Sequence, residues 1–89
     1  MWYITMVKFR RAPTKADAAA TNQRLKDWAS KGVKIHEAFY TLGRYDQVWI
    51  AEAPDEKTLM QFALSTPADL AVTETMIAVS RDEATNWLK

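Results

Sequence analysis

The chain has 89 residues, of which 48% are hydrophobic, and its 12 Lys and Arg nearly balance its 11 Asp and Glu, giving a formal net charge of +1. This charge is far from the basic footprint of a protein that binds nucleic acid or an anionic membrane. The chain has no cysteine, which excludes disulfides, thiolate metal ligands and cysteine nucleophiles. No apolar run approaches the ~18 residues that a membrane span needs. We therefore expect one small cytoplasmic domain over residues 1–89.

Residues 2–9 (WYITMVKF) combine β-branched and aromatic residues in a short run, which predicts a strand. Alternate residues of this strand fall on two faces, with Trp2, Ile4, Met6 and Lys8 on one and Tyr3, Thr5, Val7 and Phe9 on the other. Both faces are largely apolar, whereas a half-solvated strand would alternate cleanly. We therefore expect both faces of this strand to be covered.

A helix is predicted to begin after Thr14, because Thr14 followed by Asp17 has the spacing of an N-cap with an acid three residues on. The helix should run to about Lys31, and Gly32 follows where a glycine relieves the strain of a left-handed residue. The apolar residues near one stripe at helical spacing are Ala18, Leu25, Trp28 and Ala29. The residues expected to fall largely off this stripe are Lys15, Asn22, Arg24, Lys26 and Asp27.

Residues 33–54 carry the strongest fold signal. Two apolar-rich segments, 33–40 and 47–53, flank a turn at residues 43–46 (GRYD), which is typical of a β-hairpin. The simplest role of Gly43 is to supply the positive φ of the turn, and Asp46 can accept hydrogen bonds from turn backbone N–H groups.

A second helix is predicted after Asp55 as N-cap, ended by Pro67, and residues 71–79 (AVTETMIAV) predict a fourth strand. The tail over residues 80–89 begins with a capping-box pattern and could form a short amphipathic helix. We expect Trp87 in this tail to pack on the same subunit or on a neighbour. An unhindered, exposed Trp87 would contradict that expectation.

The order of the predicted elements defines the fold class. The order βαββαβ with right-handed crossovers indicates an α+β, ferredoxin-like domain, in which a four-stranded antiparallel sheet has its helices on one face. The other face is then bare in a monomer although its strands are apolar there too. Packing that face against an identical sheet would bury its apolar residues. We therefore expect a homodimer or higher homo-oligomer built as a dimeric α+β barrel.

The sequence also resembles a known family. Residues 41–46 (TLGRYD), followed by 52–55 (EAPD), are similar to the signature of the GYD domain family, and residues 3–9 (YITMVKF) and 73–76 (TETM) fit the same pattern in the same order. This resemblance covers about residues 3–79. It implies a small, mostly bacterial protein with a ferredoxin-like, dimeric α+β-barrel-type fold, and it does not name a reaction. The four tryptophans and the tail after Val79 depart from the pattern.

Six residues around the hairpin are candidates for binding a ligand: His36, Tyr40, Arg44, Tyr45, Asp46 and Trp49. In this interpretation Tyr45 donates a hydrogen bond, Asp46 acts as base or acceptor, and Arg44 holds an anion. The alternative is that residues 43–46 only form a turn and that His36 is a structural residue. Because His36 is the only histidine, it cannot belong to a histidine pair or a several-histidine metal site. We assign no catalytic residue, and we expect no metal site and no cofactor.

Two carboxylates, Glu37 and Glu74, interrupt otherwise apolar strand faces, so each must find a partner or shift its pKa. They could belong to a pocket. The alternative, which we favour, is a salt bridge between subunits with a basic residue such as Arg10, Lys34 or Arg44.

Three kinds of function remain open. The first is a homo-oligomeric module that binds a small, partly aromatic or anionic molecule between helices and sheet. The second is a cofactor-free enzyme, by analogy with monooxygenases and isomerases of this fold, and the third is a structural or regulatory interaction protein. A cavity of roughly 300 Å³ or more, lined by His36, Tyr40, Tyr45 or Trp49, would favour the first two, and a filled interior the third. An enzyme should also place a group with a perturbed pKa in that cavity.

Overall fold

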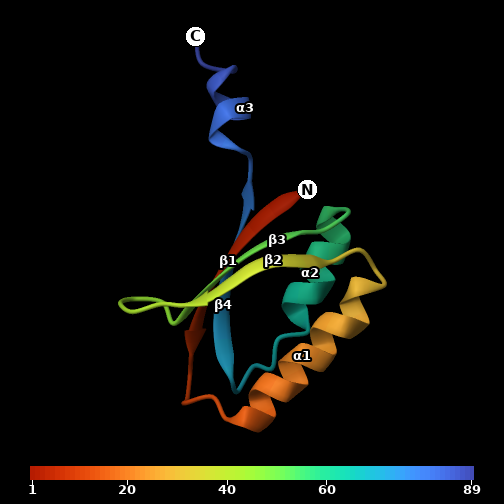
Figure 1. Ribbon diagram of the computed structural model, residues 1–89, viewed down its shortest axis with the longest axis vertical. Helices are drawn as coiled ribbons and strands as arrows, with labels where there is room; N and C mark the ends of the chain where they lie inside the picture. The colour runs from red at the N-terminus through yellow and green to blue at the C-terminus, as the bar shows by residue number, and fades with distance from the viewer.

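The computed structural model describes residues 1–89 and has the predicted α+β, ferredoxin-like architecture (Figure 1). Its elements are β1 (Trp2–Phe9), α1 (Lys15–Ala29), β2 (Lys34–Tyr40), β3 (Gln47–Glu52), α2 (Glu56–Leu64), β4 (Ala71–Ala78) and α3 (Arg81–Thr85). The four strands form one antiparallel sheet in the order β2-β3-β1-β4. No helix is long and apolar enough to cross a membrane.

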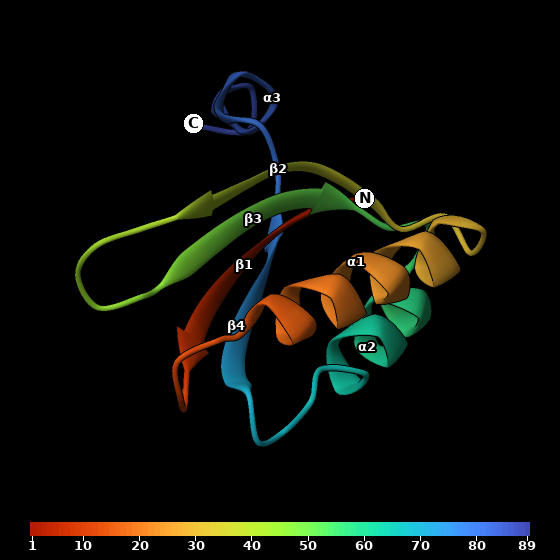
Figure 2. The ribbon, with the colours of Figure 1, turned by 60° about the horizontal axis from the view of Figure 1, so that its bottom comes forward.

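Helices α1 and α2 lie side by side against one face of the sheet, and the other face carries no helix (Figure 2). We call these the covered face and the open face. The register places Tyr3, Thr5, Val7, Phe9, Gln47, Trp49, Ala51, Thr73, Thr75 and Ile77 on the covered face. The open face carries Trp2, Ile4, Met6, Phe39, Val48, Ile50, Val72, Glu74 and Met76. The predicted division of β1 into two faces is therefore confirmed.

The hydrophobic core forms between the covered face and the two helices. Tyr3 and Ala51 are 0% exposed, Leu59 and Phe62 of α2 pack against them in the same cluster, and Trp28 of α1 adds its ring at the edge. Trp28 meets Phe62 edge-on with ring centroids 5.7 Å apart. Trp28 is therefore a core residue, as expected for an aromatic on the inner side of a helix.

The ends of α1 are formed by the residues that the sequence singles out. Thr14 Oγ1 accepts from the backbone N–H of Asp17 at 3.1 Å, and the Asp17 carboxylate accepts from the backbone N–H of Thr14 at 2.8 Å, so the capping box is present. At the other end Gly32 has φ +92°, and Val33 N–H returns to the carbonyl of Trp28 at 3.2 Å. The regular helix ends at Ala29, two residues before the predicted end, because this left-handed C-terminal motif tightens the last turn.

The inner side of α1 differs from the prediction. Ala18 and Ala29, expected on the apolar stripe, are exposed, whereas Arg24, expected largely off it, is half-buried and faces the sheet. The actual inner side runs through Asp17, Thr21, Arg24, Leu25 and Trp28. Leu25 and Trp28 set the side that packs, and Arg24 lies one turn before Trp28 on that same side.

Strand β2 contains a bulge that the sequence did not predict. Ile35 is opposite Ala51 and Glu37 is opposite Ile50, so His36 is the extra residue. Simple alternation along β2 would place His36 on one face with Lys34, Ala38 and Tyr40, and the bulge leaves only Lys34 of these three on the face of His36. Ala38 and Tyr40 pair with covered-face positions of β3, while His36 stacks on the open-face residue Trp2.

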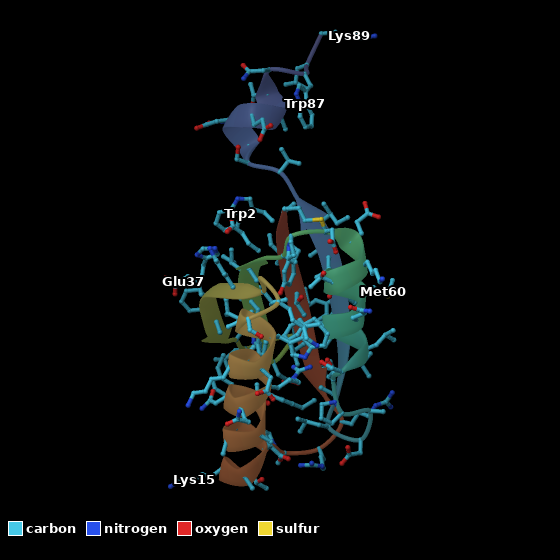
Figure 3. All side chains as sticks on the ribbon, turned by 90° about the vertical axis from the view of Figure 1, so that its right-hand side faces the viewer. Trp2, Lys15, Glu37, Met60, Trp87 and Lys89 are labelled. Carbon is cyan, nitrogen blue, oxygen red and sulfur yellow. The ribbon has the colours of Figure 1, made fainter.

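The segment over residues 79–89 projects away from the rest of the molecule (Figure 1). It contains α3, whose N-cap Ser80 accepts from the backbone N–H of Glu83 at 3.1 Å. All the hydrogen bonds of residues 80–89 stay within this segment. Trp87 is 64% exposed and lies far from the sheet (Figure 3). The expectation that Trp87 packs on its own subunit is thus wrong, and its packing on a neighbouring subunit stays a prediction.

Candidate functional site

A small hollow of about 40 Å³ lies inside the protein, between α1, α2 and the covered face. Its lining is unusually rich in hydroxyl groups, which come from Thr5, Thr21, Thr66, Thr73 and Thr75. Apolar side chains such as Trp49, Leu59 and Phe62 form much of the remainder, together with Gln47 and Arg24. A second hollow of about 50 Å³ adjoins it and shares Thr21, Arg24, Pro67 and Leu70 with the first.

Arg24 is the only ionisable side chain that lines both hollows, and Asp17 lines the second hollow alone. Its Nη1 donates to Ser65 Oγ at 2.9 Å and to Thr66 Oγ1 at 3.2 Å, and lies 3.5 Å from the carbonyl oxygen of Phe62. The guanidinium carbon also lies 4.7 Å from the centre of the Phe62 ring. These contacts fasten the guanidinium to the C-terminal end of α2.

The positive charge of Arg24 has no carboxylate partner. The ion pairs of the chain join other residues, and the buried Nε of Arg24 has no hydrogen-bond partner at all. Burial lowers the pKa of Arg24, because it disfavours the charged form, while the neighbouring Tyr3 acts in the opposite direction. A buried cation whose N–H is unpaired is costly, so an acceptor at this position would be favoured.

The hydroxyl of Tyr3 is the other buried polar group without a partner. Burial raises the pKa of Tyr3 to about 12, and the charge of Arg24 partly opposes this shift. Tyr3 lies beneath the helices but does not line the hollow. Its phenol therefore stays neutral at physiological pH and belongs to the core.

The polar groups that line the sheet side of the hollow are paired with one another. The hydroxyls of Thr5 and Thr75 lie 3.0 Å apart across β1 and β4, and Trp49 Nε1 donates to Gln47 Oε1 at 3.2 Å. Trp49 is the only one of the six predicted ligand residues that reaches the hollow. The predicted site is thus not assembled as a unit.

His36 lies instead in a cluster on the open face. Its ring stacks on that of Trp2 with centroids 4.6 Å apart, and its Nε2 lies 3.2 Å from Glu52 Oε2. Both side chains of this His36–Glu52 contact are partly exposed, so the contact adds little stability in a single chain.

Asp46 has a structural role in the hairpin. Its carboxylate accepts from the backbone N–H of Phe9 at 2.7 Å, lies 3.7 Å from Lys8 Nζ, and its own N–H donates to the carbonyl of Val7 at 2.8 Å. These bonds fasten the hairpin to the end of β1. Gly43 has φ +113° with open space around it, so its backbone conformation is the reason for a glycine, as predicted.

The remaining hairpin candidates do not line the hollow. Tyr45 donates its hydroxyl to Glu74 Oε2 at 2.7 Å on the open face, and this hydrogen bond raises the pKa of Tyr45. Tyr40 and Arg44 are exposed. Glu74 thus finds its partner within the chain. The structure contains no group of three or more His, Asp or Glu side chains that could hold a metal ion.

Arg24 is the residue that the sequence analysis missed. A signal was present, because Thr21, Arg24 and Trp28 recur at the three- and four-residue spacing of one helix side. General experience nevertheless predicts a solvated arginine at such a position, because charged residues rarely lie inward without a partner.

Fold and hollow together define a small α+β domain of the ferredoxin-like class with a polar space between sheet and helices. The chain belongs to the GYD domain family, whose family model matches residues 3–88. The resemblance predicted from residues 3–79 is therefore confirmed, and the match extends into α3.

Two solved structures are similar in fold. The chain is 23% identical to the protein titled "crystal structure of FFRP-DM1", with a TM-score of 0.58 over 89% of this chain and 100% of that chain. It is 21% identical to hypothetical protein PHS023 from Pyrococcus horikoshii, with a TM-score of 0.53 over 91% of this chain and 93% of that chain. At these identities the similarity shows the fold alone. No curated protein matches the chain.

Proposed function

We propose that this protein is a homo-oligomeric module that binds a small molecule between its helices and the covered face of its sheet. The observation that carries the proposal is the hollow beside Arg24, where hydroxyl groups and a guanidinium gather inside a core that needs only apolar side chains to be stable. Polar groups in such a place are costly unless a partner satisfies them.

The size of the hollow limits the ligand. Its volume of about 40 Å³ is far below the roughly 300 Å³ set above as the criterion for a binding pocket, so that criterion is not met and the structural or regulatory alternative stays open. The volume corresponds to about three water molecules. The ligand is therefore a molecule of a few heavy atoms, or the end of a longer one that enters through the second hollow. A larger ligand would require α1 and α2 to separate.

Binding is a better proposal than catalysis. Arg24 is the only ionisable side chain in the lining of the first hollow, and a guanidinium stays protonated even when burial lowers its pKa. It can hold an anion but it does not exchange protons near neutral pH. The enzyme alternative has no such acid or base in this lining to support it.

The homo-oligomer is supported by the open face. Trp2, Phe39 and Met76 are among the large apolar side chains that this face leaves exposed, and an apolar hollow of about 320 Å³ lies beside Trp2. A second copy of the same sheet would cover them reciprocally, giving the dimeric α+β barrel. The bacterial source and the cytoplasmic location stay predictions of the sequence.

The ligand site can be tested with a pair of leucine substitutions in α1. Thr21→Leu places a larger apolar side chain where both hollows meet, and Ala19→Leu places the same side chain on the exposed side of the helix. A library of small metabolites would be screened by backbone amide chemical shifts. We expect hits that shift hollow-lining residues in wild type and Ala19→Leu but not in Thr21→Leu.

A hit whose effect is equal in all three proteins would place binding elsewhere and contradict the proposal. Tyr45→Phe and Asp46→Ala supply a further comparison, because neither residue lines the hollow. Loss of binding in these two variants alone would return the site to the hairpin.

A further inference from the structure

We propose that the ligand of the hollow is a small carboxylate, held by a two-point hydrogen bond from the Nε and Nη2 edge of Arg24. This inference rests on the proposed function and names the chemistry of that same site.

The hydrogen bonding of Arg24 leaves one particular edge without a partner, and the Nε atom of that edge is covered by protein atoms. All three contacts to Ser65, Thr66 and the Phe62 carbonyl use Nη1, whereas Nε has no partner and Nη2 makes no hydrogen bond within the chain. Nε–H and one Nη2–H point in the same direction, and their spacing matches the two oxygens of a carboxylate. The unused edge therefore becomes a two-point donor once the atoms that cover Nε move aside.

The position of that edge is fixed before any ligand arrives. The bonds to Ser65 and Thr66 hold one end of the guanidinium, and the Phe62 ring below it, at 4.7 Å, restricts its plane. A donor that is already oriented loses little conformational freedom on binding. Such a site discriminates by geometry, which a flexible lysine ammonium would not do.

The positive charge of Arg24 also favours a carboxylate ligand. No carboxylate of the chain pairs with Arg24, and the nearest acid in the adjoining hollow, Asp17, is already paired with Arg11 at 2.6 Å. A ligand anion would therefore neutralise a charge that the protein leaves uncompensated. Two apolar side chains of the lining, Trp49 and Leu59, suit a short hydrocarbon tail on that anion.

The experiment compares three probes on the intact protein: sodium acetate, its neutral isostere acetamide, and sodium nitrate, all at one ionic strength. Arg24 Nε–H signals and thermal stability are followed in wild type, Arg24→Lys and Arg24→Met, with Arg44→Lys as a matched control at an exposed arginine. Circular dichroism confirms that each variant is folded before titration.

We expect acetate to shift the Arg24 Nε–H signal and to raise the melting temperature of wild type and Arg44→Lys in a concentration-dependent way. Arg24→Lys keeps the charge but loses the two-point geometry, so its affinity for acetate should fall roughly tenfold or more. Arg24→Met should not bind acetate. Acetamide should bind neither the wild-type protein nor any of the three variants.

Each contrary result contradicts a different part of the two proposals. If acetamide matches acetate, or Arg24→Met still binds acetate, the carboxylate inference is wrong while a ligand site in the hollow survives. If nitrate matches acetate, the site takes small anions in general and the carboxylate class is wrong. If no probe and no library compound shifts the residues that line the hollow, the proposed function fails together with this inference.

Discussion

The two faces of the sheet are built from the same strands and from similar apolar residues, yet the buried residues of the sheet lie on only one of them. On β1, Tyr3 of the covered face is 0% exposed, whereas its neighbour Trp2 on the open face is 43% exposed. The difference arises only from where α1 and α2 lie. An apolar strand residue therefore predicts a face that is buried in the native protein. The positions of the helices decide whether the same chain buries it.

The faces also treat charge differently. The open face carries Glu37, Glu52 and Glu74 where solvent or a neighbouring side chain can reach them. Glu52 and Glu74 contact His36 and Tyr45, and Glu37 is exposed to solvent. The covered face receives one charge, that of Arg24, with no ionic partner. The following predictions test this contrast.

The largest effect is expected in the core above the covered face. Phe62 is buried between Trp28 and Arg24, so Phe62→Ala should lower the free energy of unfolding by about 3–5 kcal/mol. Chemical denaturation measures this change. The control is Met60→Ala on the same helix, whose side chain is exposed (Figure 3) and should cost under about 0.5 kcal/mol. Equal losses in both variants would remove the distinction between inner and outer sides of α2.

The open face is tested by placing a charge on it. Met76→Glu introduces a carboxylate at a residue that is half-exposed in one chain and would be buried against a second copy. We expect the dissociation constant of the homo-oligomer to rise roughly 100-fold or more, since an unpaired buried charge costs several kcal/mol. Sedimentation equilibrium measures it. Met60→Glu makes the same change on the helix side and should leave the assembly intact; a monomeric wild type would refute the proposed oligomer outright.

The contacts of Asp46 that attach the hairpin to β1 should have an intermediate effect on the free energy of unfolding. Asp46→Ala removes the acceptor of Phe9 N–H and the partner of Lys8, so we expect a loss of about 1–3 kcal/mol in unfolding free energy. Tyr45→Phe removes only an exposed hydrogen bond to Glu74 and should cost less than about 1 kcal/mol. If the order of the two losses were reversed, Asp46 would not be the structural residue of the pair.

A smaller change of opposite sign is expected beneath the helices. Tyr3→Phe removes a buried hydroxyl that has no partner, so the variant should be more stable by roughly 1 kcal/mol, the lower end of the cost of an unpaired buried group. Thermal unfolding compares it with wild type. A destabilised Tyr3→Phe would reveal a hydrogen bond, for example to ordered water, that holds this hydroxyl.

The smallest effect concerns the carboxylates that cap α1 and α2. The hydrogen bond from Arg11 lowers the pKa of Asp17, and the backbone N–H of Thr58 lowers that of Asp55, both below the ordinary value of 3.8. The unfolded chain therefore takes up these protons first as the pH falls. Their stabilising effect is complete above about pH 4 and is lost as the pH falls through the lower folded-state pKa values.

Melting temperatures between pH 7 and pH 2 test this. Asp17→Asn should melt earlier than wild type at pH 7 and should lose less stability on acidification, because the protonation it mimics has already occurred. Asp82→Asn, in the projecting tail, should follow wild type throughout. A parallel acid profile for wild type and Asp17→Asn would show that Asp17 contributes nothing to the pH dependence.

Local patterns made most of the fold predictable. Thr14, Gly32, Gly43 and Asp55 specify helix ends and a turn through their own backbone chemistry, and the alternation in β1 reveals two apolar faces. The βαββαβ order then leaves few possible topologies. None of these steps needs information from distant parts of the chain.

The site was less predictable because it depends on packing. The bulge at His36 moves that residue to another face than simple alternation gives, and no local residue pattern marks it. Asp46 looks equally suited to catalysis and to structure until its bonds to Phe9 and Lys8 are known. Arg24 became a candidate only when its three contacts to the end of α2 showed that it points inward.

The projecting segment after Ala78 has a consequence for protease sensitivity. Because residues 80–89 bond only among themselves, cleavage there breaks no contact that the sheet or the core needs. Limited trypsin digestion should therefore cut first after Arg81 and leave residues 1–81 folded. The surviving body, with its hollow and both sheet faces, would be a smaller unit in which ligand binding and self-association can be measured without α3.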